Sequence, residues 1–134
     1  WDALDEVGVT AYQPVAGDAA GAWAEALEAA TRTAAGRPLV VTEYGYPALA
    51  SAADRPWDET TGAPPDDALQ ARLTAAALQA LGCARPAASF AWNWFGHAAD
   101  PNSPFSPRGR PAAAVLRDHF ATDASARCLR PETR

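Results

Sequence analysis

Glu43 ends a short apolar run, and its position makes it the first candidate for chemistry. The run from Pro38 reads Pro-Leu-Val-Val-Thr-Glu and is followed by Tyr-Gly-Tyr. Such a run is typical of a strand buried on both faces, where a terminal carboxylate is poorly placed for simple solvation. In glycoside hydrolysis an ionised carboxylate attacks or stabilises an oxocarbenium-like centre, and a protonated carboxyl group releases the leaving group. Glu43 could supply the first group. The alternative is a buried structural glutamate paired with an arginine.

Aromatic residues end the two other short apolar segments. Tyr12 follows Val-Gly-Val-Thr-Ala, and Trp92 and Trp94 lie in Ser-Phe-Ala-Trp-Asn-Trp. A phenol that donates to a carboxylate favours the ionised form and fixes its rotamer, so Tyr12 and Glu43 would make a working pair. An indole face can pack on the apolar face of a pyranose. Period-two alternation predicts that Trp92 and Trp94 share one side of a strand. The alternatives are a core tyrosine and two tryptophans that only fill space.

Residues 44–65 are rich in Pro, Gly, Asp and Ser and are predicted to form a long loop. Long loops in compact domains are usually functional. Tyr44 and Trp57 are the candidate substrate contacts in this segment, and Asp58 and Glu59 could form a wall of a cleft beside them. The alternative is a loop anchored by its own tryptophan, with solvated acids next to it.

Three strand and helix units must position these residues. We expect strands at 7–12, 38–43 and 89–94. Asp18 is expected to cap a first helix that ends near Gly36, and Asp66 or Asp67 a second helix that ends at Gly82. Pro111 is expected to open a third helix. Residues 1–120 would then be one portion of a domain, and residues 121–134 a tail.

Strict alternation of strands and helices predicts an α/β fold with a parallel sheet. Tyr12 and Glu43 are 43 − 12 = 31 residues apart, close to the roughly 31 residues per unit of a (β/α)₈ TIM barrel. In such barrels the reactive residues stand at the carboxyl ends of the strands. We therefore predict part of a TIM barrel. A small self-contained α/β domain, with a sheet that does not curl, is the competing interpretation.

Composition narrows the class of partner. The net charge of −5 argues against nucleic acid or an anionic membrane surface and favours a neutral substrate. No group of residues has the spacing of a metal site, a phosphate-binding loop or a Gly-x-Ser-x-Gly elbow, so neither a metal nor a cofactor is implied. No apolar run approaches the roughly 20 residues of a membrane span.

Two further features concern the chain as a whole. Cys83 and Cys128 are too few for a disulfide scaffold, and we expect two thiols, with a single disulfide as the alternative. The sequence contains no Met and starts at Trp1, directly inside a patterned segment. We interpret the chain as a piece of a longer one.

Taken together and in order, five segments resemble the last three units of clan A glycoside hydrolases, and most closely family 113, the endo-β-mannanases. The resemblance covers about residues 2–120. The segments are Leu4–Pro14, Arg37–Tyr46, Pro56-Trp57, Phe90–Trp94 and Gly109–Ala112.

This resemblance implies a retaining glycoside hydrolase that cleaves a β-1,4-linked polysaccharide, with β-mannan as the expected substrate. The clan's nucleophile ends strand seven, which corresponds to Glu43. The strand-six aromatic that contacts the nucleophile corresponds to Tyr12. The strand-eight tryptophan beneath the reacting sugar corresponds to Trp92, and less closely to Trp94. If the parent protein follows the family, it is secreted or lies in the cell envelope.

One departure from the clan limits what this chain can do. The clan's acid/base glutamate follows an asparagine at the end of strand four, and no Asn-Glu pair occurs in this sequence. We therefore expect the chain alone to be inactive, and its partner to be the missing N-terminal part of the barrel or a second copy of itself. Another clan A β-glycan hydrolase and a non-catalytic carbohydrate-binding remnant of a barrel are the alternative functions.

Overall fold

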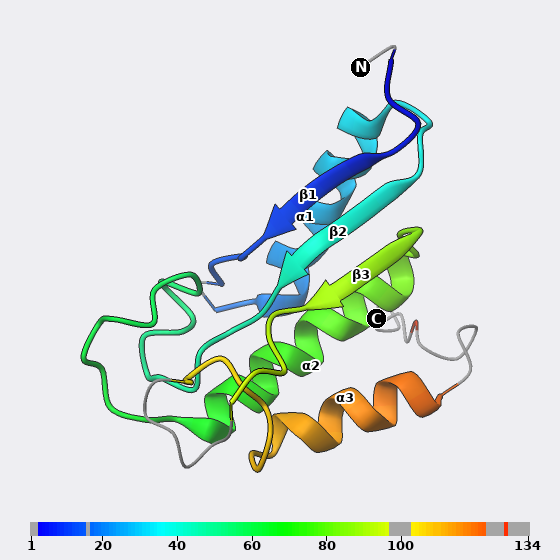
Figure 1. Ribbon diagram of the computed structural model, residues 1–134. Coiled ribbons are helices and arrows are strands. Elements are labelled where there is room, and N and C mark those ends of the chain that lie inside the picture. Colours follow the sequence, from blue (N-terminus) through cyan, green and yellow to red (C-terminus); the bar gives the residue numbers. More distant parts are fainter. Residues whose placement is uncertain (1–2, 16, 97–102, 123–127, 129–134) are drawn as a thin grey trace, which may run out of the picture.

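The computed structural model describes residues 3–15, 17–96, 103–122 and 128, and Figure 1 shows a parallel sheet with helices packed behind it. The elements, in chain order, are β1 (Val7–Ala11), α1 (Ala19–Ala34), β2 (Leu39–Tyr44), α2 (Asp67–Ala84), β3 (Ala88–Ala91) and α3 (Ala112–Ala121). The strands pair in parallel in the order β1-β2-β3. The predicted parallel α/β fold is confirmed, and the strand ends that carry Tyr12, Glu43 and Trp92 are adjacent in that order.

The core lies between the sheet and the helices. The Trp23 indole of α1 is fully buried, and its N–H donates to the Tyr46 hydroxyl over 2.6 Å. That hydroxyl in turn donates to the carbonyl of Gln13 over 2.8 Å. A buried indole needs such a partner, and this one ties α1 to the segments that follow β1 and β2. The core cluster comprises Val15, Trp23, Leu27, Val41, Tyr44, Tyr46, Ala52, Leu73, Ala77, Leu78, Ala80, Leu81 and Leu116.

The helix starts follow the predicted capping, whereas one predicted helix end is wrong. Asp18 accepts from the Gly21 amide over 3.0 Å, and Asp66 accepts from the Leu69 amide over 2.8 Å. Gly82 does not end α2, which continues to Ala84 and closes with Arg85 in the left-handed conformation. The Arg85 amide donates to the Leu81 carbonyl, so the terminating hydrogen bond forms without a glycine.

Two other predictions need correction. The third strand ends at Ala91, not at residue 94, so strand alternation does not govern the two tryptophans that follow it. Cys83 and Cys128 form a disulfide, with their Cα atoms 4.5 Å apart. The prediction of two thiols was wrong because the chain after α3 returns to the end of α2, which no local pattern reveals. Of the predicted tail, only residues 121, 122 and 128 are described, and residue 121 still belongs to α3.

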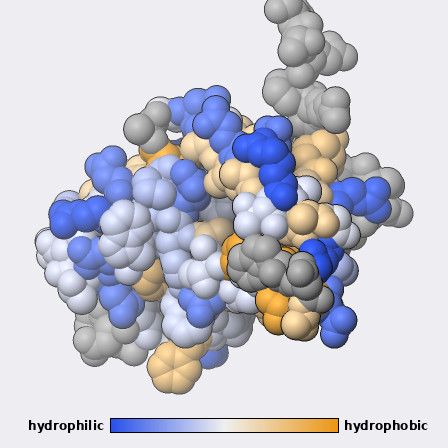
Figure 2. Space-filling view, turned by 90° about the horizontal axis from the view of Figure 1, so that it is seen from above, coloured by the Kyte–Doolittle hydropathy of each residue, from blue (hydrophilic) through white to orange (hydrophobic). Residues whose placement is uncertain are grey.

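No described helix covers the face of the sheet opposite α1 and α2. Gly8, Thr10, Thr42 and Phe90 are exposed on the strands, and among the described residues β1 and β3 each have one neighbouring strand. Figure 2 views the end of the molecule where the strands begin. Hydrophilic and intermediate residues cover much of this view, and hydrophobic residues gather on its right-hand side. The candidate site lies at the other end. In the described segments no helix combines the length and apolarity needed to cross a membrane.

Candidate active site

A β-bulge in β2 decides which way Glu43 faces. Val9 pairs with Val41, but the next residue of β1, Thr10, pairs with Glu43, which leaves Thr42 as the extra residue. The pairing with β3 skips in the same place. Without the bulge, period two would put Glu43 on the helix side together with Val41. The extra residue re-aims the strand end, so Glu43 leaves the core and Tyr44 enters it.

Tyr12 and Glu43 meet as predicted from the sequence. The Tyr12 hydroxyl donates to Oε2 of Glu43 over 2.9 Å. Burial raises the pKa of the Tyr12 phenol well above its usual value, and the hydrogen bond to Glu43, the charge of Glu43 and the charge of Glu59 act in the same direction. Tyr12 therefore stays protonated and remains a donor. No described arginine lies within ion-pair distance of Glu43, so the arginine-paired alternative has no support.

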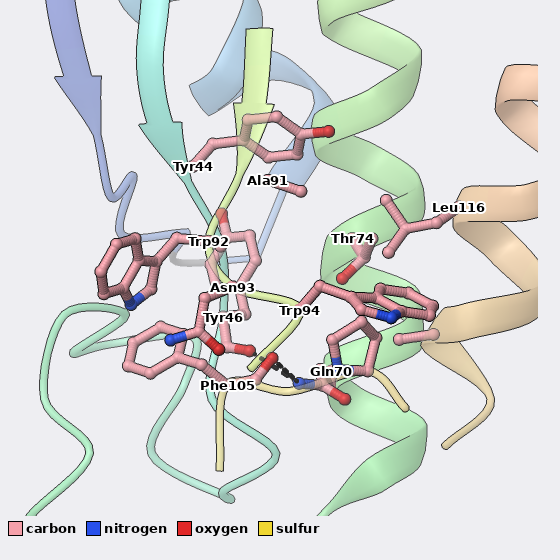
Figure 3. Close-up of a pocket in the computed structure, with 13 residues that line it drawn as sticks. Tyr44, Tyr46, Gln70, Thr74, Ala91, Trp92, Asn93, Trp94, Phe105 and Leu116 are labelled. Carbon is pink, nitrogen blue, oxygen red and sulfur yellow. Dashed lines mark hydrogen bonds between the residues drawn. The ribbon is translucent and has the colours of Figure 1, made fainter. Parts of the chain in front are cut away.

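The two tryptophans after β3 diverge. In Figure 3 the Trp92 indole lies on the side of Phe105, whereas the Trp94 indole lies toward α2 and α3. The expectation that they share one side was wrong, because β3 has already ended at Ala91. Trp92 is held against β2, since its amide donates to the Tyr44 carbonyl over 2.7 Å. Its side chain is 45% exposed, which leaves an indole surface free to meet a ligand.

Gly45 allows β2 and the residues after β3 to approach closely. A Cβ atom at this position would lie 2.2 Å from the Trp92 carbonyl oxygen and 3.5 Å from the Phe105 ring. The first distance is far below any real contact with a backbone atom, so only glycine fits. The glycine in Thr-Glu-Tyr-Gly-Tyr thus sets the spacing between the Glu43 strand and Trp92.

The other predicted substrate contacts in the segment after Glu43 are Tyr44 and Trp57. Tyr44 is 1% exposed and lies in the core, so it does not face the strand ends. Trp57 is 56% exposed in the loop after β2. Asp58 beside it accepts from the amide and the hydroxyl of Thr60, and these bonds lower the pKa of its carboxyl group. The negative charge of Glu59 raises the pKa of the Tyr12 phenol. This part of the loop therefore lies near the site.

Phe105 is the residue that the sequence analysis missed. Its ring packs edge-on against Tyr12, with the ring centroids 5.8 Å apart and the planes at 72°. It is 5% exposed although it belongs to no helix or strand. The only signal in the sequence was an aromatic residue within a Pro- and Ser-rich segment, which does not specify a partner.

The described residues provide one carboxylate at a strand end. β1 ends at Ala11 and β3 at Ala91, and only β2 carries an acid at this position. No group of three His, Cys, Asp or Glu among them could hold a metal ion. The arrangement can therefore orient one carboxylate through a phenol and offer an indole surface beside it.

Neither the protein-family models nor the curated proteins gave a match to this sequence. Solved structures do match. The structure of a GH113 β-1,4-mannanase and that of a complex of such an enzyme have TM-scores of 0.75 and 0.74 at 18% sequence identity. The GH113 β-mannanase AaManA from Alicyclobacillus acidocaldarius, in complex with ManMIm, has a TM-score of 0.66 at 24% identity.

These matches cover most of this chain but less than half of the others. They include 92%, 92% and 90% of the present chain, which spans 41%, 41% and 40% of the matched chains. At such identities the likeness concerns the fold. The expectation that the chain has the fold of part of a TIM barrel is confirmed. The chain has the fold of one portion of a GH113 β-mannanase, built from three of the strand and helix units.

Proposed function

We propose that this chain is the nucleophile-bearing part of a retaining glycoside hydrolase that cleaves β-1,4-mannan. The observation that carries the proposal is the Tyr12 to Glu43 hydrogen bond at the carboxyl ends of two adjacent parallel strands. Catalytic groups of barrel enzymes occupy these ends. The β-mannanase neighbours support the substrate class.

In this mechanism Glu43 attacks the anomeric carbon of the sugar. The bond from that carbon to the leaving oxygen breaks as a second carboxyl group donates its proton to the oxygen, and a glycosyl ester of Glu43 forms. The second group then removes a proton from water, which attacks the same carbon and releases Glu43 with net retention. Tyr12 donates to Oε2 of Glu43, which fixes the rotamer of the carboxylate and leaves Oε1 for the attack.

Trp92 is the proposed platform for the reacting sugar. Its indole is partly exposed and is held beside the Glu43 strand by its amide and by the close approach of Gly45. An aromatic face offers a large, rigid contact to the apolar face of a pyranose. Trp94 and Tyr44 point away from this surface, so we leave them out of the proposed sugar contacts. Trp57 stays a candidate at the rim.

The acid/base carboxyl group must come from elsewhere. We propose about five further strand and helix units that complete the eight of the barrel, supplied by the same polypeptide or by a second chain. Their strands would pair with the free edges of β1 and β3 and cover the face of the sheet opposite α1 and α2. We call this assembly the complete barrel. A binding-only remnant would keep Trp92 but would have no use for Glu43.

The test is the Glu43→Ala variant of the complete barrel, assayed on mannan and on an aryl β-mannoside. Turnover should fall by several orders of magnitude, and azide should restore cleavage of the aryl glycoside with an α-linked glycosyl azide as product. Glu28→Gln on the exposed face of α1 is the matched control and should keep full activity. Unchanged turnover of Glu43→Ala would remove Glu43 from the mechanism.

A further inference from the structure

The segment 103–106 is held by its backbone carbonyls, although it forms no regular secondary structure. Arg110 Nη1 donates to the carbonyls of Ser103 and Ser106. Gln70 Nε2 donates to the carbonyls of Pro104 and Phe105, each over 3.2 Å. Two side chains thus donate hydrogen bonds to all four consecutive carbonyls. Backbone carbonyls that are buried need such partners.

Both of these side chains are fixed to the start of α2. Gln70 is 2% exposed, and its Nε2 also donates to the Tyr46 carbonyl over 2.9 Å, as Figure 3 shows. The amide has two hydrogens for three carbonyl acceptors, so at least one of them is shared between two carbonyls. Arg110 Nε donates to Asp67 Oδ1 over 3.0 Å. The segment is therefore anchored to the first turn of α2 and to the chain after β2.

The anchored segment presents one side chain to the candidate site. The Phe105 ring meets the Tyr12 ring edge-on and also lies beside Gly45. The Tyr12 side chain is then constrained at two points, its hydroxyl by Glu43 and its ring by Phe105. A tyrosine held at both points has one position, and so does the carboxylate that accepts its hydrogen bond.

We propose that Phe105 is a positioning residue, which Gln70 and Arg110 hold in place so that Tyr12 orients the Glu43 carboxylate. The effect of Phe105 on catalysis rests on the proposed function, whereas its effect on the orientation of Tyr12 does not. Hydrogen bonds weaken steeply as their angle departs from linear, and reacting groups must be held to within about 0.5 Å. Loosening the ring would therefore impair the site without removing any group that touches a sugar.

The experiment follows Tyr12 by its ring Cζ resonance in the 134-residue chain, as a function of pH. The chain has three tyrosines, so assignment requires few variants. In the wild type the Tyr12 resonance should keep its phenol position up to the highest pH at which circular dichroism shows a folded chain. In Phe105→Leu, added solvent and a loosened bond to Glu43 should bring its titration down toward about pH 10.

Two further variants test whether the shift is specific to the Phe105 contact. Phe95→Leu removes a ring that is 79% exposed and should leave the Tyr12 titration unchanged. Gln70→Met keeps the length of the side chain but removes the amide, and it should shift Tyr12 in the same direction as Phe105→Leu even if that variant does not fold. An unshifted Tyr12 in folded Phe105→Leu or in folded Gln70→Met would overturn the proposal.

A second readout separates this proposal from the proposed function. In the complete barrel, Phe105→Leu should lower kcat by about 10- to 100-fold, as small misplacements do, with little change in KM, and Phe105→Tyr should restore kcat. If Glu43→Ala keeps full turnover, the proposed function fails while the Tyr12 titration still decides the role of Phe105. If Glu43 is essential and Phe105→Leu retains the wild-type kcat, the positioning role fails alone.

Discussion

Gly45→Ala is predicted to separate the Glu43 strand from Trp92. The new Cβ atom would lie 2.2 Å from the Trp92 carbonyl oxygen and 3.2 Å from its carbon. Ordinary carbon to oxygen contacts start at about 3.3 Å, so the backbone must move by about 1 Å. The adjacent bond from the Trp92 amide to the Tyr44 carbonyl, 2.7 Å long, resists this movement. Overpacking of this kind costs about 1–3 kcal/mol.

Thermal unfolding followed by circular dichroism measures this cost. A loss of about 1–3 kcal/mol should lower Tm by roughly 3–12 °C in a chain of this size. Gly8→Ala on β1 is the matched control, because its Cβ atom would meet only the Thr42 methyl group, at 3.0 Å, and a side chain can move aside. If Gly45→Ala is as stable as Gly8→Ala, the close approach that positions Trp92 is not a constraint.

Three further predictions concern the same chain. Burial raises the pKa of Tyr44 to about 12, so its stabilising effect is complete below about pH 10 and is lost as the pH rises toward 12. Chemical denaturation should show that Tyr44→Phe loses less stability than the wild type between pH 10 and 12. Replacing Cys83 and Cys128 by Ser opens a loop with a sequence separation of 45 and should lower the free energy of unfolding by up to about 4 kcal/mol, as urea titration would show. The chain alone should not hydrolyse mannan or aryl β-glycosides, because general acid catalysis contributes about 10²- to 10⁴-fold to the rate. Turnover that depends on Glu43 would mean that the chain itself contains an acid that serves this role. Size-exclusion chromatography should show that the chain associates with itself through the edges of β1 and β3.

Local patterns in the sequence predicted much of the fold. The capping carboxylates Asp18 and Asp66 mark both helix starts because an N-cap acts within three residues. The apolar run before Glu43 predicts a buried strand by its composition. Because strands in parallel units end at one side of a sheet, Tyr12 and Glu43 were expected to lie near each other, and the resemblance to clan A implied that they are partners.

Features that depend on pairing between distant segments could not be predicted. The bulge at Thr42 is defined by the pairing of β2 with β1 and β3. It places the Tyr44 side chain on the helix side of the sheet and the Glu43 side chain on the other side. Tyr44 therefore lies in the core, whereas its neighbour Glu43 does not. Phe105 lies 93 positions after Tyr12, 105 − 12, and no periodicity links them.

The central claim is that Glu43 forms a covalent bond with the sugar. The most direct measurement treats the complete barrel with a 2-deoxy-2-fluoro β-mannosyl fluoride and maps the labelled peptide by mass spectrometry. Fluoride leaves without protonation, and the fluorine at C2 slows hydrolysis of the ester, so the intermediate should accumulate. We predict a single glycosyl adduct on Glu43 that is absent from Glu43→Gln. A barrel that hydrolyses mannan with retention but carries the adduct on another residue would contradict the claim.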